Sequence, residues 1–204
     1  MTELGTTELE RALGSAVERG DLSAATRLLL ERAEHEKLID VGYATMDSPY
    51  GELTIAATER GVVRLGLPNR SQDEVLEEIA ATISPRMLEL PARLDPARRQ
   101  LEAYFERRLD RFDVPIDWQL AEGFRGKVLH AIAKIPYGRT LSYGEVAARA
   151  GNPRAYRAAG SACGSNPVPL IVPCHRVVQA SGEPGNYGGG PEMKKALLEL
   201  EGVI

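Results

Sequence analysis

The chain has 204 residues, of which 43% are hydrophobic and 26% charged, a composition that suits one large or two small globular domains. No run approaches the roughly 18 apolar residues that a membrane helix needs, and the acidic start does not resemble a signal peptide, so we expect a cytoplasmic protein without a membrane partner. Two cysteines are too few for a disulfide framework or a cysteine-rich zinc site, and we expect neither a metal nor a cofactor.

The net charge of −4 is unevenly distributed along the chain. Residues 1–119 carry 15 Lys and Arg against 23 Asp and Glu, a balance of −8, whereas residues 120–204 carry 10 against 6, a balance of +4. Eight basic residues and a single acid, Glu145, lie from Arg125 to Arg176. This segment either faces the phosphates of a nucleic acid or forms a solvated surface, and charge alone favours neither interpretation.

Residues 1–38 contain two short apolar runs at helical spacing, separated by Gly20-Asp21. We expect an N-terminal helical extension, which would be either a hairpin packed on the rest of the protein or a loosely attached accessory.

From residue 41 to residue 118 the pattern is typical of an α+β domain with a small antiparallel sheet. Apolar residues first alternate with others in three short runs separated by turns, which predicts a three-stranded meander. Two helices follow, the first opened by a capping box of Ser71 and Glu74 and the second by Asp95-Pro96. The expected elements cover residues 43–46, 53–57, 62–67, 71–83 and 95–109, with a connector at 112–118.

Residues 119–204 are expected to form a mainly helical domain. A second capping box, Ser142–Glu145, opens a helix that ends at Gly151, and Asn152-Pro153 would start the next helix at once. Two short helices joined in this way are typical of a helix-turn-helix. The expected helices begin near residues 124, 143, 153 and 191.

The helix expected after Asn152 has two different sides at helical spacing. One side is small and basic, and suits close approach to a DNA groove. Its residues are Arg154, Arg157, Ala158 and Ser161. The other side is apolar enough to pack inward. Its residues are Tyr156, Ala159 and Cys163.

Pro173-Cys174-His175-Arg176 is the segment most suited to chemistry. A free cysteine has a pKa of about 8.5, so a nucleophilic cysteine needs a base or a positive field nearby. His175 is an adjacent base, but neighbours in an extended segment point to opposite faces, so a contact with Cys174 requires a turn or a bridging water. The alternative is a buried structural cysteine beside an exposed histidine, which is favoured for an isolated Cys-His pair.

Several further motifs surround this segment. They are Tyr137–Thr140, Ser142–Ala147, Asn152–Ala155, Asn166–Pro169, Ile171–Val178, Gly185–Tyr187 and Leu197–Gly202, together with Asp47–Leu53 in the first half. In this order and spacing they resemble the O6-alkylguanine-DNA alkyltransferase family, and the resemblance covers residues 41–204. It implies an α+β domain at 41–118 and a DNA-binding and alkyl-acceptor domain at 119–204, whereas the helical extension expected at 1–38 has no counterpart in the family pattern.

The resemblance also implies roles for individual residues. Cys174 matches the nucleophile and alkyl acceptor, and His175 matches the base that takes the thiol proton through a water. Glu201 matches the carboxylate that orients His175. Asn166 matches a hinge residue, and Tyr143 a tyrosine that contacts DNA beside the flipped base and can donate a proton towards guanine. Taken singly, Tyr143 could be a core aromatic and Glu201 a solvated carboxylate.

Other residues match the DNA contacts and the base pocket of the family. Arg157 matches the finger that fills the gap left by the flipped nucleotide, although by itself it could be a surface charge. The pocket residues implied are Tyr187, Val172, Pro169 and Gly188. The DNA-contacting residues implied are Arg157, Arg154, Ala158, Ser161 and Tyr143.

The function implied is DNA repair by direct reversal. The protein, as a monomer, would bind double-stranded DNA, flip out the damaged base, and move the alkyl group of O6-alkylguanine to Cys174 in a single turnover. O4-alkylthymine is a further candidate substrate. Other readings are an alkyltransferase-like DNA-binding protein, which would lack the cysteine, a helix-turn-helix regulator, and a cysteine hydrolase. Cys163 is expected to be a small buried side chain, with its alkylation a minor alternative.

Overall fold

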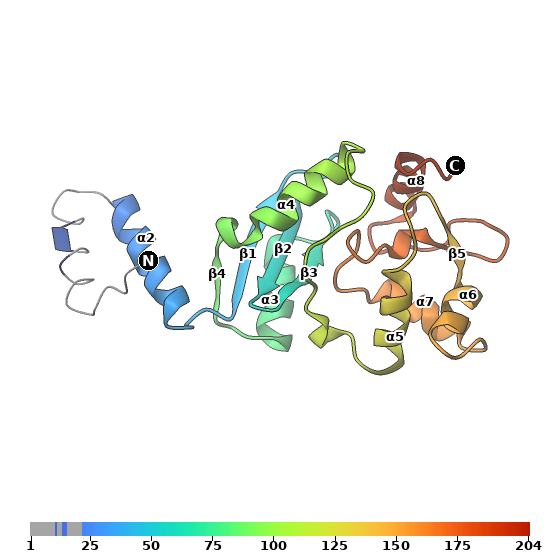
Figure 1. Cartoon of the computed structure of the whole chain (residues 1–204), viewed down its shortest axis with the longest axis horizontal. Helices are drawn as coiled ribbons and strands as arrows, with labels where there is room; N and C mark the ends of the chain where they lie inside the picture. The colour runs from blue at the N-terminus through green and yellow to red at the C-terminus, as the bar shows by residue number, and fades with distance from the viewer. Residues whose placement is uncertain (1–10, 12–13, 16–21) are drawn as a thin grey trace. The chain divides into compact units, whose positions relative to one another are not determined.

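The computed structural model describes Arg11, Gly14, Ser15 and residues 22–204. The contacts of the chain separate two compact units, Met1–Asp40 and Val41–Ile204. In the first unit, helix α2 (Leu22–His35) confirms the second of the two helices expected there (Figure 1). The other helix expected in this unit lies largely outside the described residues.

A four-stranded mixed sheet begins the second unit (Figure 1). Its strands are β1 (Val41–Met46), β2 (Leu53–Thr58), β3 (Gly61–Gly66) and β4 (Met87–Glu89), in the order β3-β2-β1-β4. The antiparallel pairing of β1 with β2 and of β2 with β3 confirms the expected meander. The sequence did not indicate β4, which pairs parallel with β1, because three residues are too few to show an alternating pattern.

Two helices cover the two faces of this sheet. Helix α3 (Gln72–Thr82) begins at the expected capping box of Ser71 and Glu74 and packs Val75 and Ile79 against one face. Helix α4 (Pro91–Phe105) packs against the other face. The expected start at Asp95-Pro96 is wrong, because α4 begins with Pro91 at its first position and Pro96 lies inside the helix.

The second half of this unit is mainly helical, as expected. It contains η1 (Trp118–Leu120), α5 (Gly123–Ile132), β5 (Leu141–Ser142), α6 (Tyr143–Arg149), α7 (Tyr156–Gly164), η2 (Cys174–Arg176), β6 (Val177–Val178) and α8 (Pro191–Leu200). The capping box at Ser142 is confirmed. Strands β5 and β6 form a short parallel pair. None of the helices in the described part of the chain is long and apolar enough to cross a membrane.

The expected start of α7 is wrong by three residues. Oδ1 of Asn152 accepts from the backbone N–H of Arg154, and the carbonyl of Asn152 accepts from Ala155. These bonds close a turn in place of the first helical turn, so Asn152, Pro153 and Arg154 precede a helix that starts at Tyr156.

The two halves of the second unit share one hydrophobic core, which includes residues from β1, β2, α4, α5, α7 and α8. The connector between the halves pairs with β3 through Ile116 and Val62. Asp117, which is buried, accepts hydrogen bonds from Thr58 and Arg60. Residues 41–204 therefore form one body in which both halves can contribute to a common site.

Candidate active site

Cys174 lies on the one-turn 3₁₀ helix η2, and Cys174, His175 and Arg176 are all buried. A 3₁₀ helix has three residues per turn, so consecutive side chains do not alternate between two opposite faces. The chain therefore makes a turn at the position where a contact between Cys174 and His175 would require one. The alternative of an exposed histidine is wrong, because His175 has no exposed surface.

Asn166 fixes the chain around the thiol. Its side-chain amide donates to the carbonyl of Val172 at 2.8 Å and lies 3.1 Å from Cys174 Sγ, and its Oδ1 accepts from the backbone N–H of Val168. The turn between Val168 and Val172 passes through buried Leu170, whose φ of +71° lies in a region that residues other than glycine rarely adopt. Asn166 thus joins both ends of this turn.

The Cys174 thiol is poorly ionised in this environment. Burial raises its pKa to about 11, although the hydrogen bond from Asn166 and the charge of Lys194 act in the opposite direction. Burial raises the pKa of the other thiol, Cys163, to about 12. A nucleophilic role for Cys174 therefore requires a base that removes the proton as the thiol reacts.

His175 and Glu201 form a buried pair in which Nε2 lies 2.8 Å from Oε1. Burial alone would raise the pKa of Glu201, but hydrogen bonds from His175 and Arg176 hold it at about 2, so the carboxylate only accepts. The ring hydrogen must then lie on Nε2, which leaves Nδ1 as the acceptor. Burial lowers the pKa of His175 and favours its neutral form, and Nδ1 has no hydrogen-bond partner in the described part of the protein.

Glu201 is held by more donors than the sequence indicated. Arg176 donates from Nε and Nη2 to the carboxylate at 2.9 to 3.1 Å, and from Nη1 to the carbonyl of Ile135. The hydroxyl of Tyr104 and the backbone N–H of Gly138 donate at 2.8 and 3.2 Å. Arg176 is thus a buried partner of Glu201, and it does not belong to a phosphate-facing surface.

Sequence reasoning missed two buried polar residues of this site, Tyr104 and Lys194. Lys194 is fully buried, and its Nζ donates to the carbonyls of Val177 at 2.6 Å and Asn186 at 3.3 Å. Its position in α8 was a usable signal, because helical spacing places it beside Met193 and Leu197 on the apolar side. Tyr104 lies at core spacing in α4 and gave no sign of its polar contacts.

Two hollows share Tyr187 and Gly188, and one of them is also lined by Cys174. One, of about 140 Å³, is lined by Cys174, Asn166, Pro169, Tyr187 and Gly188, with residues of β3 and of the loop after it. The other, of about 520 Å³, shares Tyr187 and Gly188 and adds Tyr143. Pro169, Tyr187 and Gly188 therefore line one hollow together with Cys174, and Tyr143 lines the other. Val172 is buried and lines neither hollow.

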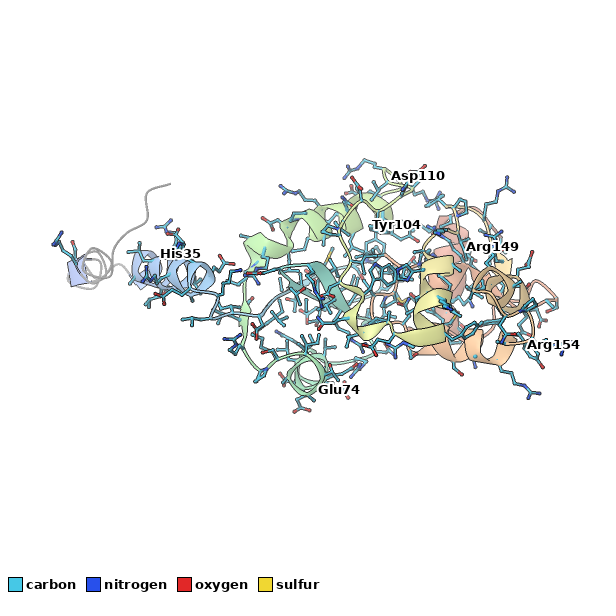
Figure 2. The ribbon with its side chains drawn as sticks, turned by 60° about the horizontal axis from the view of Figure 1, so that its bottom comes forward. His35, Glu74, Tyr104, Asp110, Arg149 and Arg154 are labelled. Carbon is cyan, nitrogen blue, oxygen red and sulfur yellow. The ribbon has the colours of Figure 1, made fainter. Side chains whose placement is uncertain are left out.

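The exposed side of α7 holds Arg157, Ala158 and Ser161, as the helical spacing predicts. Arg154 is also exposed but belongs to the turn before the helix, and Figure 2 shows it at the surface of the second half. The expectation that Tyr156 packs inward is wrong, since it is 51% exposed and its ring lies under the Arg157 guanidinium. The inward residues of α7 include Ala159 and Cys163, as expected.

A basic groove of about 800 Å³ lies along α5 and the end of α6. Four of its lining residues are Lys127, His130, Lys134 and Arg149, and its lining includes no acidic residue. Lys127, Lys134 and Arg149 are exposed and take part in none of the ion pairs found among the described residues. The His130 ring stacks on Trp118 with centroids 3.9 Å apart.

Comparisons with known proteins place this geometry in a family. Residues 41–118 match the model of the 6-O-methylguanine DNA methyltransferase ribonuclease-like domain, and residues 123–203 match that of the DNA binding domain of the same family. A relative from Mycobacterium bovis, named methylated-DNA–protein-cysteine methyltransferase, is 44% identical over 161 residues, which are 79% of this chain and 92% of the relative.

Solved structures give the same result. The O6-methylguanine methyltransferase of Mycobacterium tuberculosis superposes with a TM-score of 0.66 at 42% identity, covering 79% of this chain and 92% of the other. The OGT of the same organism in complex with DNA has a TM-score of 0.66 at 42% identity, covering 78% and 92%. The shared fold joins a ribonuclease-like domain to a DNA binding domain. The chain belongs to the 6-O-methylguanine DNA methyltransferase family.

Proposed function

We propose that this protein repairs alkylated DNA by moving the alkyl group from O6 of guanine to Sγ of Cys174. The observation that carries the proposal is the placement of a buried thiol beside a neutral imidazole with a free acceptor nitrogen, in a chain of this family. Its relatives are named for methyl transfer from DNA to a protein cysteine. O4-alkylthymine would react by the same chemistry.

In the proposed reaction, Nδ1 of His175 takes the thiol proton through a water molecule. The thiolate then attacks the alkyl carbon, so that an S–C bond forms as the C–O6 bond breaks and its electron pair passes to the guanine ring. Tyr143 supplies a proton towards the leaving guanine. Glu201 stabilises the imidazolium that forms on His175, as the carboxylate does in other sets of nucleophile, base and orienting group.

The product is a thioether on Cys174. The proposed reaction has no step that cleaves this thioether and regenerates the thiol, so each molecule would act once. The cysteine hydrolase reading requires repeated turnover and has no support in the family match. The alkyltransferase-like reading requires a chain without the acceptor cysteine, whereas Cys174 is present.

The target atom lies inside the duplex, so the base must leave the stack before it can reach a buried thiol. We propose that α7 enters the minor groove with Arg157 in the gap, that Arg154, Ala158 and Ser161 face the DNA, and that the basic groove contacts backbone phosphates. We also propose that the protein binds as a cytoplasmic monomer. Residues 41–118 and 119–204 would be its two domains, with residues 1–38 as an extension.

The test is a duplex that contains one O6-methylguanine, with an unmodified duplex as control. The intact mass of the wild-type chain should increase by one methyl group per molecule and then stop. Cys174→Ala should gain no methyl group and bind the duplex within about 3-fold of wild type, since Sγ is buried and the proposed phosphate contacts come from other residues. Wild-type chain that gains no methyl, or repeated turnover, would contradict the proposal.

A further inference from the structure

Tyr104 is one of the largest fully buried side chains in the described structure. It lies on α4, in the first half of the 41–204 unit, and Figure 2 shows it beneath that helix. Its hydroxyl donates to Oε1 of Glu201 at 2.8 Å and lies 3.4 Å from Nε2 of His175. The residue therefore joins the first half to the His175–Glu201 pair of the second half.

Three side chains donate hydrogen bonds to Oε1 of Glu201. His175 donates to this oxygen from Nε2, Arg176 donates from Nη2, and Tyr104 donates from its hydroxyl. A carboxylate oxygen accepts in a limited number of directions, so each donor restricts where the others can lie. Tyr104 is also a dependable donor, because burial raises its pKa far above the neutral range.

We infer that Tyr104 is a positioning residue, through which the first half of the protein orients Glu201 and sets the basicity of His175. The inference rests on the proposed function, in which His175 is the base. A hydrogen bond from Tyr104 takes up part of the negative charge on Oε1. Glu201 then stabilises the imidazolium of His175 less than an unshared carboxylate would, and the ring hydrogen stays on Nε2.

The charged groups that act on His175 come from several elements. Glu201 raises its pKa, whereas Arg176 from η2 and Lys194 from α8 lower it, and burial lowers it most. Tyr187 also packs edge-on to the ring, with centroids 6.2 Å apart. Removal of the Tyr104 hydroxyl leaves all of these groups in place, so its effect on His175 can be measured separately.

The experiment compares Tyr104→Phe with Tyr137→Phe as the matched control. Tyr137 packs edge-on to Tyr104, and its hydroxyl donates to the carbonyl of Leu200 and not to the Glu201 carboxylate. Nitrogen chemical shifts of the three histidines, followed against pH with His175→Gln as the assignment standard, report the pKa and tautomer of His175 without any need for alkyl transfer. Single-turnover transfer from an O6-methylguanine duplex is measured over the same pH range.

We expect Tyr104→Phe to raise the pKa of His175 by about half a unit or more, and to move the acid limb of the transfer rate to higher pH by the same amount. At neutral pH, where His175 is neutral in both proteins, the transfer should slow by roughly 3- to 10-fold, because Glu201 and His175 are held less firmly without the hydrogen bond from Tyr104. Tyr137→Phe should leave both readouts unchanged.

Three results would overturn the inference. They are an unchanged pKa of His175 in Tyr104→Phe, an equal rate loss at every pH, and a wild-type ring that carries its hydrogen on Nδ1. The last measurement needs no variant, so the test holds even if Tyr104→Phe does not fold. Wild-type protein that transfers no methyl group would overturn the proposed function instead, while the titration of His175 would still judge the role of Tyr104.

Discussion

Burial at Cys174 works against the thiolate that alkyl transfer requires, and nearby side chains offset part of this effect. The pKa of the thiol is raised to about 11 by burial, although Asn166 donates to Sγ and Lys194 contributes positive charge. In the absence of a damaged base the thiol therefore stays protonated and reacts slowly with other compounds. Ionisation coupled to attack, with Nδ1 of His175 as the acceptor, fits a reagent that can be used only once.

The pKa of Glu201 predicts how the stability of the protein depends on pH. Its pKa is about 2 in the folded protein against an ordinary value of 4.5, so folding gains stability from this group above pH 4.5 and loses it as the pH falls from 4.5 towards 2. Glu201→Gln should lower the free energy of unfolding at pH 7 by on the order of 3 kcal/mol, because Arg176 loses its buried partner. Urea unfolding at pH 7 and at pH 3 measures the effect.

The difference in stability between Glu201→Gln and wild type should narrow at pH 3, because the wild-type carboxylate is then largely protonated in the unfolded chain but still mostly ionised in the folded protein. Glu199→Gln is the matched control, because Glu199 is exposed and its side chain forms a long surface ion pair with Lys195. A stability difference that stays constant between the two pH values would contradict the assigned pKa of Glu201.

At the scale of elements, the basic groove is lined by α5 and by the end of α6. Lys127 and Lys134 line it without an ion-pair partner among the described residues, so they are free to contact phosphates. The double variant Lys127→Gln with Lys134→Gln should reduce the slope of log K for DNA against log salt by about 2. Fluorescence anisotropy with an undamaged duplex between low and moderate salt measures this slope.

The double variant Arg108→Gln with Lys195→Gln controls for the general loss of two positive charges. It also removes two cations, but both are exposed and already paired with carboxylates of their own chain. Its salt slope should stay within about 0.5 of wild type. Equal slopes for the two double variants would show that the groove does not contact DNA and that its cations form only a solvated surface.

Local signals predicted the elements well where a side chain satisfies the backbone. The capping boxes at Ser71 and Ser142 placed the starts of α3 and α6 correctly, since hydroxyl and carboxylate groups bond the free N–H groups there. Proline was a weaker signal. Pro96 lies inside α4, and Pro153 lies in a turn closed by Asn152, so a proline marks where a helix can begin without fixing where it does.

The site was predictable only in part, for the same kind of reason. Cys174, His175, Asn166 and Glu201 lie in motifs that resemble a known family, and the structure brings them together. Tyr104 joins them from 97 positions before Glu201, and its sequence neighbourhood is that of any core aromatic. Only tertiary packing reveals such a contact, because local periodicity describes which side of a helix is buried but not what that side meets.

At the scale of the whole molecule, residues 41–204 form one unit, and the family models match within it. The hydroxyl of Tyr104 from the first half reaches the acceptor site in the second, so the two halves should act together. A chain of residues 41–204 should therefore transfer a methyl group at a rate within about 2-fold of the full chain, since the proposed acceptor residues all lie in it. Single-turnover kinetics on the same duplex measures both chains.

A rate that falls more than 10-fold when residues 1–40 are removed, with thermal unfolding of the remainder unchanged, would assign the N-terminal unit a part in the reaction. An unchanged rate with weaker binding to undamaged DNA would instead assign it a part in DNA contact.

The central claim is that Cys174, and not Cys163, is consumed. Both thiols are buried and both line the hollow beside Tyr187, but only Cys174 receives the hydrogen bond from Asn166 and lies next to His175. The most direct measurement is peptide mass mapping after reaction with an excess of O6-methylguanine duplex. The account predicts one methyl group per chain on the peptide that contains Cys174 and none on the peptide that contains Cys163. A methyl group on Cys163, or an unmodified Cys174 after the guanine has been repaired, would contradict it.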